Sequence, residues 1–251
     1  MVNNLSRQIS WEDGERLFCR GQYPGNGGTD NVLIARPAAE YPSSASLDRL
    51  AHEFRLKDEL DSAWAVRPLE LLRADGQTLL VLEDPGGEPL EQMLVAPIDV
   101  GKVLRFAVGI AAALGQLHQR GFVHKDLKPS HILVNCRDGL PRITGFGIAS
   151  RLPREHQAPE PPETIAGTLA YMAPEQTGRM NRSIDSRSDL YSLGIVLYQM
   201  LTCSLPFSAV EPMEWVHCHI ARTPVPPCER LKPIPSLLSR IVMKLLAKTA
   251  E

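Results

Sequence analysis

The chain has 251 residues, 43% of them hydrophobic, and a formal net charge of −2 at pH 7. A chain of this length can bury a sizeable core as one large or two small domains. The nearly balanced charge argues against a nucleic-acid partner. No apolar signal core occurs at the N-terminus, and no apolar run reaches the roughly 18 residues of a membrane span, so a cytoplasmic protein without membrane insertion is expected.

The cysteines are dispersed without Cys-x-x-Cys spacing, at Cys19, Cys136, Cys203, Cys218 and Cys228. Their odd number and wide separation favour reduced thiols over a disulfide framework. A zinc site at His217-Cys218-His219 is a minor alternative, because neighbouring residues on one element point in different directions.

Apolar runs separated by turn signals predict three strands near the N-terminus, around Ile9 and Trp11, from Leu17 to Cys19, and from Asn31 to Arg36. The turn after the first strand, Asp13-Gly14-Glu15, has one glycine and two acids and is a poor cradle for an anion. The glycine-rich segment from Tyr23 to Asp30 partly imitates a phosphate-binding loop. Because it directly precedes the third strand, we expect a hairpin turn there.

Further along the chain, Ser46 is expected to cap a helix that carries Leu47, Leu50 and Phe54. A buried strand from Leu79 to Leu82 should be broken at Glu83-Asp84-Pro85-Gly86-Gly87. The remaining expected elements are a helix from Val103 to His118, a hairpin around Asp138-Gly139, a helix from Asp189 to Leu201, and a helix capped by Ser236.

The most informative stretch follows the helix that ends near His118, and it reads His124-Lys125-Asp126-Leu127-Lys128-Pro129-Ser130-His131 before an apolar strand. Three further segments follow in order: Gly145-Phe146-Gly147, Gly167-Thr168-Leu169-Ala170-Tyr171-Met172-Ala173-Pro174-Glu175 and Asp189-Leu190-Tyr191-Ser192-Leu193-Gly194. Together they resemble the eukaryotic-type (Hanks-type) serine/threonine protein kinases, whose catalytic loop has the pattern H-R-D-L-K-P-x-N. The arrangement is also similar to the N-terminal kinase-like module of large bacterial sensor proteins that carry an ATPase and a histidine kinase.

The resemblance implies an α+β, bilobal protein-kinase-like fold, with a small antiparallel β lobe that carries one helix and a larger, mostly helical lobe. The expected domains are a kinase-like N-lobe at residues 1–84 and a C-lobe at residues 85–251. At least one further helix should follow Glu251, so the chain is expected to be part of a longer multidomain protein.

The resemblance also implies roles for individual residues. Asp126 matches the aspartate near the substrate hydroxyl, Lys128 the lysine that reaches the γ-phosphate, and Thr168 the activation-segment threonine. His124 is expected to pack under the loop as a structural histidine. Lys125 could pair with a phosphate on Thr164, although not in a bidentate manner.

A second group of residues is implied to bind the cofactor. Glu53 matches the helix glutamate that pairs with the lysine of the third strand, and a solvated surface acid is the alternative for it. Backbone near Glu83 and Asp84 would bond the adenine of ATP. The third-strand lysine falls on Ala35 or Arg36, which point to opposite faces of a strand. Ala35 is favoured at the site, and Arg36 could supply charge there only if it faced the cleft.

The two magnesium-binding positions of the family are both changed. The asparagine falls on His131, and the aspartate of D-F-G falls on Gly145. An imidazole is a poor ligand for a hard cation that prefers oxygen, and glycine has no side chain. The resemblance therefore implies ATP as cofactor, whereas no side chain is assigned to a metal and Mg²⁺ binding is doubtful.

These changes lead to a serine/threonine protein-kinase-like signalling domain with strongly reduced or absent phosphotransfer, that is, a pseudokinase-like module for a protein substrate or a regulatory partner domain. The alternative is an active ATP-dependent serine/threonine kinase with an atypical metal site. A third hypothesis is a scaffold whose proline-rich segment 153–162 binds partners.

Overall fold

The structure is a computed structural model that describes residues 9–25, 28–74, 76–135, 138–152, 167–180 and 182–249. Contacts within the chain group it into two compact units. Unit 1 comprises Met1–Pro89 and Ser130–Gly147, and unit 2 comprises Leu90–Pro129 and Ile148–Glu251. Unit 1 is mainly β and unit 2 mainly helical, so the predicted α+β class is confirmed. The predicted domain boundary between residues 84 and 85 stays a prediction.

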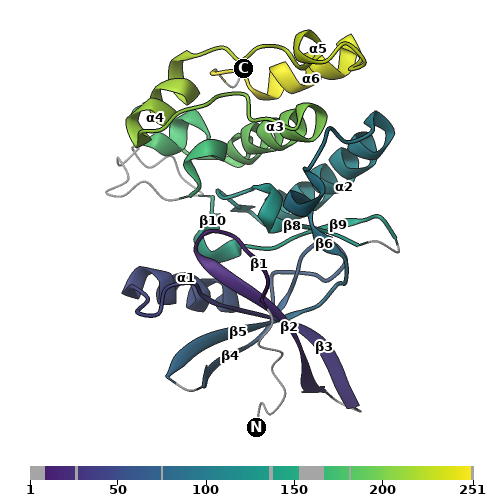
Figure 1. Ribbon diagram of the computed structural model, residues 1–251. Coiled ribbons are helices and arrows are strands. Elements are labelled where there is room, and N and C mark those ends of the chain that lie inside the picture. Colours follow the sequence, from purple (N-terminus) through teal and green to yellow (C-terminus); the bar gives the residue numbers. More distant parts are fainter. Residues whose placement is uncertain are drawn as a thin grey trace. The chain divides into compact units, whose positions relative to one another are not determined.

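Unit 1 is built on a five-stranded antiparallel sheet with the order β1-β2-β3-β5-β4 (Figure 1). Its strands are β1 (Ile9–Glu12), β2 (Arg16–Gly25), β3 (Gly28–Pro37), β4 (Pro68–Ala74) and β5 (Gln77–Glu83). Strands β2 and β3 pair without interruption from Arg16 opposite Pro37 to Gly25 opposite Gly28. The glycine-rich segment therefore belongs to a hairpin, as predicted, although residues 26 and 27 of its turn lie outside the described residues.

The two faces of this sheet carry separate apolar clusters. One face buries Trp11, Phe18, Leu33, Ala35, Val66, Leu80 and Leu82 together with Leu50 of helix α1 (Ser44–Arg55) and Leu133. The other face buries Val32, Ile34, Leu79 and Val81. Because side chains alternate along a strand, Arg36 follows Ile34 onto the second face, whereas Ala35 faces α1. Of the two residues that the sequence left open, Ala35 is thus the one on the α1 side of the sheet.

Helix α1 begins earlier than the sequence predicted. Ser43 is its N-cap, and the Ser43 hydroxyl oxygen accepts a hydrogen bond from the Ser46 amide at 3.2 Å. The prediction of Ser46 as the cap was wrong, because Ser43 satisfies an amide of the first turn and Ser46 lies inside the helix. The apolar spacing that predicted the helix itself is confirmed by the burial of Leu50.

A second, three-stranded sheet completes unit 1, in the order β6-β8-β9. Its strands are β6 (Glu88–Pro89), β8 (Ile132–Val134) and β9 (Pro141–Ile143). The pairing of β8 with β9 confirms the hairpin predicted around Asp138-Gly139. His131 lies directly before β8 and Gly145 two residues after β9. The hairpin therefore brings both residues to the same end, next to the pair of Ile132 and Ile143.

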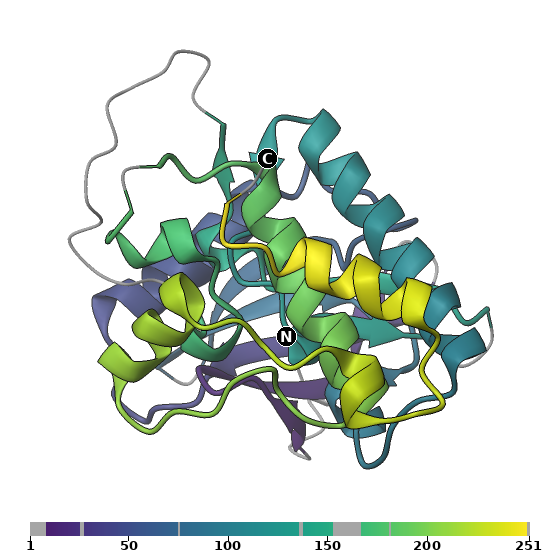
Figure 2. The same cartoon turned by 90° about the horizontal axis from the view of Figure 1, so that it is seen from above.

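Unit 2 is organised around α3 (Ser186–Thr202), most of whose residues are buried. The other helices are α2 (Val100–Gln119), α4 (Pro212–Ala221), α5 (Pro227–Arg230) and α6 (Ser236–Leu245), and a small sheet pairs β7 (Phe122–Val123) with β10 (Ser150–Arg151). Figure 2 shows α6 lying against α3. Short 3-10 segments occur at η1 (Leu90–Met93), η2 (Pro129–His131), η3 (Phe146–Ile148), η4 (Leu169–Tyr171) and η5 (Pro174–Thr177).

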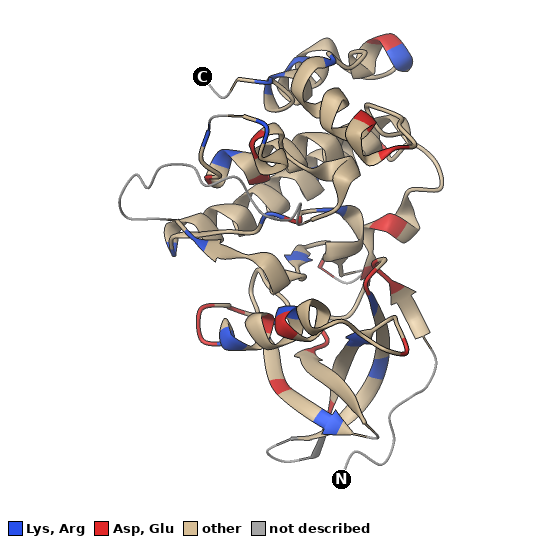
Figure 3. Ribbon diagram, turned by 90° about the vertical axis from the view of Figure 1, so that its left-hand side faces the viewer, with Lys and Arg blue, Asp and Glu red and all other residues tan. Residues whose placement is uncertain are grey.

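The predicted helices of unit 2 are present with shifted starts. Asp185 caps α3 and moves its start to Ser186, and Pro235 occupies the cap position that had been predicted for Ser236. Within the described ranges, α2 is the one helix whose length and composition would fit a membrane span. A core helix meets the same criteria, and α2 buries a full stripe of apolar residues: Val103, Phe106, Ile110, Ala113, Leu114 and Leu117. Charges of both signs are interspersed along the chain (Figure 3).

Candidate functional site

The three residues predicted to be catalytic lie together in unit 2. The Thr168 amide donates to Asp126 Oδ1 at 2.8 Å, and Lys128 Nζ donates to the Thr168 hydroxyl at 3.0 Å. Lys128 Nζ also lies 3.8 Å from Asp126 Oδ2, and the Asp126 side chain is 15% exposed. These contacts order the loop against the segment that contains Thr168 and leave part of the Asp126 carboxylate open to solvent. The catalytic roles of the three residues stay predictions.

The backbone of this loop is held by a buried carboxylate of α3. Asp189 Oδ2 accepts a hydrogen bond from the His124 amide at 2.9 Å and lies 2.8 Å from His118 Nε2, while Oδ1 accepts from the Lys125 amide at 2.9 Å. Lys125 has a φ of 68°, a left-handed conformation that is uncommon for a residue with a side chain. The hydrogen bonds from the His124 and Lys125 amides to the Asp189 carboxylate hold this conformation, and Asp126 follows Lys125 in the loop.

The side chains beside Asp126 differ in environment. His124 is fully buried, and its Nδ1 accepts a hydrogen bond from the Asp126 amide at 3.2 Å, in line with the structural role expected for it. Burial lowers the pKa of the Lys125 ammonium, and the nearby Asp189 carboxylate partly opposes that shift. Thr164, the phosphate acceptor suggested for Lys125, and the proline-rich segment 153–162 lie outside the described residues.

A hydrogen-bonded chain inside unit 2 ends next to Thr168. Lys248 Nζ donates to the Tyr191 hydroxyl at 3.0 Å, Tyr191 contacts His219 Nδ1 at 3.0 Å, and His219 Nε2 contacts the Leu169 carbonyl at 2.8 Å. A carbonyl can only accept, so Nε2 carries the proton and Nδ1 accepts from Tyr191. Burial lowers the pKa of His219 to about 4, which fits this neutral form.

The same contacts bear on the zinc alternative at His217-Cys218-His219. Both ring nitrogens of His219 have protein partners, and the ring stacks on Trp215 with centroids 5.9 Å apart. Across the part of the chain that the structure describes, no group of three His, Cys, Asp or Glu residues is arranged to hold a metal ion. The structure therefore gives the zinc site no support.

Unit 1 contains a buried group of charged and polar side chains, which we call the Arg16 cluster: Asp13, Arg16, Glu53 and His131. Arg16 Nη1 lies 2.7 Å from Glu53 Oε2, and Arg16 Nη2 lies 2.7 Å from Asp13 Oδ2. His131 Nε2 lies 3.0 Å from Asp13 Oδ2 and 3.2 Å from Arg16 Nη2. Glu53 Oε1 accepts a hydrogen bond from the Gly145 amide at 3.2 Å.

The local sequence explains how these residues meet. Asp13 closes the turn between β1 and β2, because its Oδ1 accepts from the amides of Glu15 and Arg16 at 3.0 and 2.7 Å. Arg16 is the first residue of β2, and its guanidinium carbon lies 5.0 Å from the centroid of the Phe18 ring. Glu53 lies near the end of α1 and is 0% exposed. The alternative that Glu53 is a solvated surface acid is therefore wrong.

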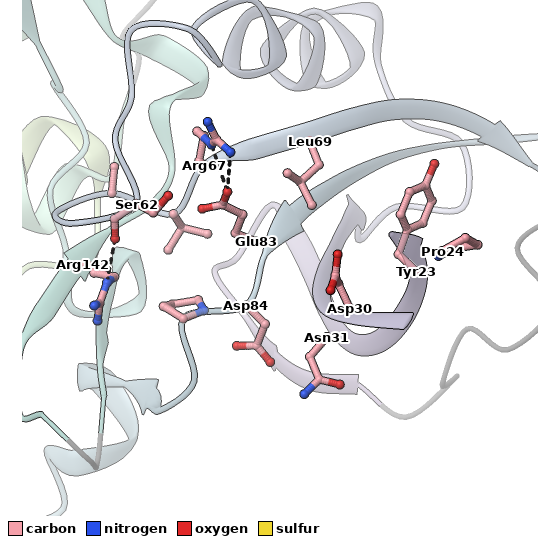
Figure 4. Close-up of a pocket in the computed structure, with 13 residues that line it drawn as sticks. Tyr23, Pro24, Asp30, Asn31, Ser62, Arg67, Leu69, Glu83, Asp84 and Arg142 are labelled. Atoms are coloured by element: carbon pink, nitrogen blue, oxygen red, sulfur yellow. Dashed lines mark hydrogen bonds and ion pairs between the residues drawn. The ribbon is translucent and has the colours of Figure 1, made fainter. Parts of the chain in front are cut away.

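The side chains of the remaining predicted cofactor residues lie elsewhere in unit 1. Arg36 lies on the sheet face opposite α1, so the structure gives no support to Arg36 as the partner of Glu53. Glu83 is paired with Val32 across β3 and β5, and it lies on that same opposite face. Glu83 and Asp84 line a cavity of about 700 Å³ in unit 1, where Arg67 lies 2.7 Å from Glu83 Oε1 (Figure 4).

The backbone of the segment after β5 is largely engaged within unit 1. Pro85 has no N–H to donate, and its carbonyl accepts a hydrogen bond from Asn135 Nδ2. Asp84 accepts from the Gly86 amide at 2.9 Å and from Arg20 Nε at 3.2 Å. Arg20 also donates to the Gly87 carbonyl. These contacts tie β2 and Asn135 to the segment, and the adenine contact of this backbone stays a prediction.

The sequence profile described as Protein kinase domain matches residues 35–251 of the chain. The chain belongs to the protein kinase family. It is 35% identical over 175 residues, or 68% of its length, to the serine/threonine-protein kinase Pkn1 of Myxococcus xanthus. It is 30% identical over 80% of its length to pkn3 of the same organism, and 31% identical over 68% to PknB of Mycobacterium tuberculosis.

The chain spans only part of each of these relatives, namely 25% of Pkn1, 38% of pkn3 and 27% of PknB. Strands β1 and β2 and most of β3 precede the matched range, so Asp13 and Arg16 do too. The match therefore includes Glu53 and His131, whereas the other half of the Arg16 cluster, Asp13 and Arg16, lies outside it.

The two metal positions of the protein kinase family do not fit Mg²⁺ in this chain. Mg²⁺ requires oxygen ligands in a near-octahedral arrangement, and these positions hold the imidazole of His131 and the glycine at 145. A Cβ atom placed on Gly145 would lie 2.5 Å from His131 Nδ1, and Gly145 has a φ of 85°. The position has therefore neither a metal ligand nor the space for one.

Sequence reasoning missed the partner of Glu53. The third-strand lysine of a kinase is replaced by Ala35, and the structure supplies Arg16 from the adjacent strand instead. The signal available was an arginine directly after a turn that contains two acids. That signal could not identify Glu53, because Glu53 is separated from Arg16 by 37 residues and only the folded sheet and α1 bring them together.

Proposed function

We propose that this protein kinase domain acts as a regulatory or binding module of the serine/threonine type with strongly reduced or absent phosphotransfer. The observation that carries the proposal is the pair at the metal positions, where His131 fills the space beside Gly145. Metal neutralisation of a transferring phosphate is worth several kcal/mol. Since about 1.4 kcal/mol changes a rate tenfold, loss of both ligands should lower transfer by several orders of magnitude.

The apolar cluster that contains Leu82, at the end of β5, supports the same proposal. An adenine bonded to the backbone after Leu82 would need apolar space beside that residue. Trp11 stacks on Phe18 with ring centroids 4.5 Å apart, and both rings are buried with Leu82 and Leu133. The chain's own side chains thus fill this part of unit 1, which disfavours nucleotide binding.

The alternative is an active ATP-dependent serine/threonine kinase with an atypical metal site. The contacts among Asp126, Lys128 and Thr168 favour it, because they keep the loop ordered and the Asp126 carboxylate partly exposed. In that case Arg16, which pairs with Glu53, would supply the charge that the sequence suggested for Arg36.

Context and location belong to the same proposal. Because the chain spans 25–38% of the three relatives, we propose that it belongs to a longer signalling protein and that its partner is a protein substrate or a regulatory domain. We also propose a cytoplasmic location, as expected for the kinase domains of the bacterial relatives.

Calorimetric titration of the domain with ATP, with and without MgCl₂, separates the proposal from its alternative. It is paired with labelling by radioactive ATP of the wild type and of Asp126→Asn, with an active serine/threonine kinase as positive control. The proposal predicts no Mg²⁺-dependent binding and equal, background labelling of both proteins. Mg²⁺-dependent binding together with labelling that Asp126→Asn abolishes would establish the active kinase instead.

A further inference from the structure

We propose that Arg16 is the positioning residue of α1. Its guanidinium holds this helix against the β1–β2 turn and requires neither nucleotide nor metal. The inference rests on the proposed function, in which no phosphotransfer cycle requires α1 to respond to a ligand. In an active kinase the third-strand lysine connects the helix glutamate to bound phosphate. Here the equivalent connection runs from Glu53 to Arg16 and Asp13, so it is complete within the protein.

The charges of the cluster explain why an arginine is needed. The side chains of Asp13 and Glu53 are 1% and 0% exposed, and two buried carboxylates in one place repel each other. Arg16 contacts both through different nitrogens of its planar guanidinium, which a lysine ammonium could not do with the same geometry. Removing the guanidinium would leave the two buried carboxylates without their shared cation, which strongly destabilises a protein.

The cluster joins segments that are distant in the sequence. Asp13 lies in the β1–β2 turn, Glu53 lies in α1, and His131 lies directly before β8. The Gly145 amide, which follows β9, adds a bond to Glu53 at 3.2 Å. The position of α1 is therefore fixed to both sheets of unit 1 by polar contacts, in addition to its apolar packing through Leu50.

The two changed metal positions depend on each other through this cluster. Any side chain at 145 would collide with the His131 ring, whose Nδ1, Cγ and Cε1 atoms lie 2.5 to 2.7 Å from the site of a Cβ. His131 cannot move away without breaking its contact with Asp13. An aspartate can therefore be placed at 145 only when His131 is also replaced. Because His131 belongs to the Arg16 cluster, the absence of metal ligands at these two positions is coupled to that cluster.

Hydrogen exchange of α1 tests the positioning role of Arg16. The amides of residues 44–55 are followed by mass spectrometry in the wild type, Arg16→Met and Arg16→Lys. Both variants should exchange faster, Arg16→Met by at least about tenfold, because the buried carboxylates lose their shared partner. If Arg16→Met does not fold, Arg16→Lys is used instead, because it keeps the positive charge but lacks the planar guanidinium that contacts both carboxylates. Unchanged α1 exchange in Arg16→Lys would then overturn the proposal.

Arg49→Met is the matched control. Arg49 lies on α1 and pairs with Glu15 in the β1–β2 turn, so it joins the same two elements, but at the surface. Exposed ion pairs contribute little, and exchange in this variant should stay within about twofold of the wild type. An effect equal to that of Arg16→Met would overturn the special role of the buried pair.

A ligand arm separates this inference from the proposed function. Adding ATP, ADP or MgCl₂ to the wild type should leave α1 exchange unchanged, and protection of α1 by any of them would overturn the ligand-independent role. Labelling that depends on Asp126 overturns the proposed function, whereas equal α1 exchange in the wild type and Arg16→Met overturns the role of Arg16. The two failures are thus read from different measurements.

A double-mutant cycle tests the coupling of His131 and Gly145. Thermal unfolding is compared for Gly145→Ala in the wild type and in His131→Ala. Gly139→Ala is the control for backbone strain, since Gly139 has a φ of 68° with nothing within 4 Å of a Cβ. Gly145→Ala should lower Tm more than Gly139→Ala does, and the excess should vanish in His131→Ala. An equal loss in both backgrounds would overturn the coupling.

Discussion

The loop around Asp126 in unit 2 and the Arg16 cluster in unit 1 satisfy their charges in different ways. Asp126 and Asp189 accept hydrogen bonds mainly from backbone amides, and Asp126 keeps 15% of its side chain exposed. In the Arg16 cluster the carboxylates of Asp13 and Glu53 bond to a guanidinium and are closed to solvent. The Asp126 carboxylate is thus ordered and partly exposed, whereas the Arg16 cluster encloses its carboxylates.

The two sites therefore differ in how far their carboxylates are open to solvent: that of Asp126 is partly exposed, and those of Asp13 and Glu53 are buried. Because Asp189 holds the loop through main-chain amides, these contacts do not depend on which side chains positions 124 and 125 carry. A closed network does depend on its side chains, because each charge needs its partner in a low-dielectric interior.

The largest expected effect comes from the anchor of the loop. Asp189→Ala leaves the amides of His124 and Lys125 without their acceptor in a buried place. We expect the free energy of unfolding of unit 2 to fall by about 3–5 kcal/mol, in the range measured when one partner of a buried charged network is removed. Urea denaturation followed by circular dichroism measures the change.

Asp185→Ala is the control for this variant, since Asp185 caps the same helix by accepting from the Arg187 amide at 2.8 Å. Loss of an N-cap lowers stability by about 1 kcal/mol. If Asp189→Ala lowered stability no more than Asp185→Ala, the loop would not depend on the Asp189 carboxylate. The description of the loop as held by hydrogen bonds from its amides to Asp189 would then be wrong.

Many elements of both units could be predicted from local patterns, although β4 and α4 were not. The helical period gave α2 and α6, the apolar run after Asp189 gave α3, and the turn signals gave the hairpins of β1 with β2 and β8 with β9. Helix starts were less accurate, because Ser43 and Ser46 are chemically equal candidates for the cap and only the fold decides which amide is free. The contact of Asp126 with Lys128 and Thr168 followed from the family pattern.

The Arg16 cluster could not be predicted in the same way. Its members are brought together by the pairing of β2 with β3 and the packing of α1, which are properties of the whole sheet. The same is true of Ala35 and Arg36, since a shift of one residue exchanges the two faces of a strand. Family resemblance singled out Glu53, but its partner and its burial depend on tertiary structure.

The second prediction concerns pH and the chain of contacts that holds Leu169 beside Thr168. Burial lowers the pKa of His219 to about 4, whereas its usual value is 6.5. The unfolded state then binds more protons than the folded state between about pH 4 and pH 6.5, so stability should rise with pH across that window. The shift corresponds to about 3 kcal/mol.

The comparison of wild type with His219→Gln isolates this effect. Carboxylates titrate in the same range in both proteins, so only the difference in unfolding free energy between them is assigned to His219. The other titratable groups around the ring are Tyr191 and Lys248, and Lys248 lowers the pKa further by its charge. A difference that does not change between pH 4 and pH 6.5 would contradict the buried, neutral imidazole.

The smallest expected effect separates ordering from exposure in the loop itself. Thr168→Ala removes the hydroxyl that accepts from Lys128 but keeps the amide that donates to Asp126. We expect a loss of about 1 kcal/mol in the free energy of unfolding, because water can still reach this partly exposed site. Thr168→Ser keeps the hydroxyl and should stay within a few tenths of a kcal/mol of the wild type in urea denaturation. A loss near that of Asp189→Ala would mean that the trio is closed like the Arg16 cluster, and Asp126 would then be positioned for structure and not for a substrate.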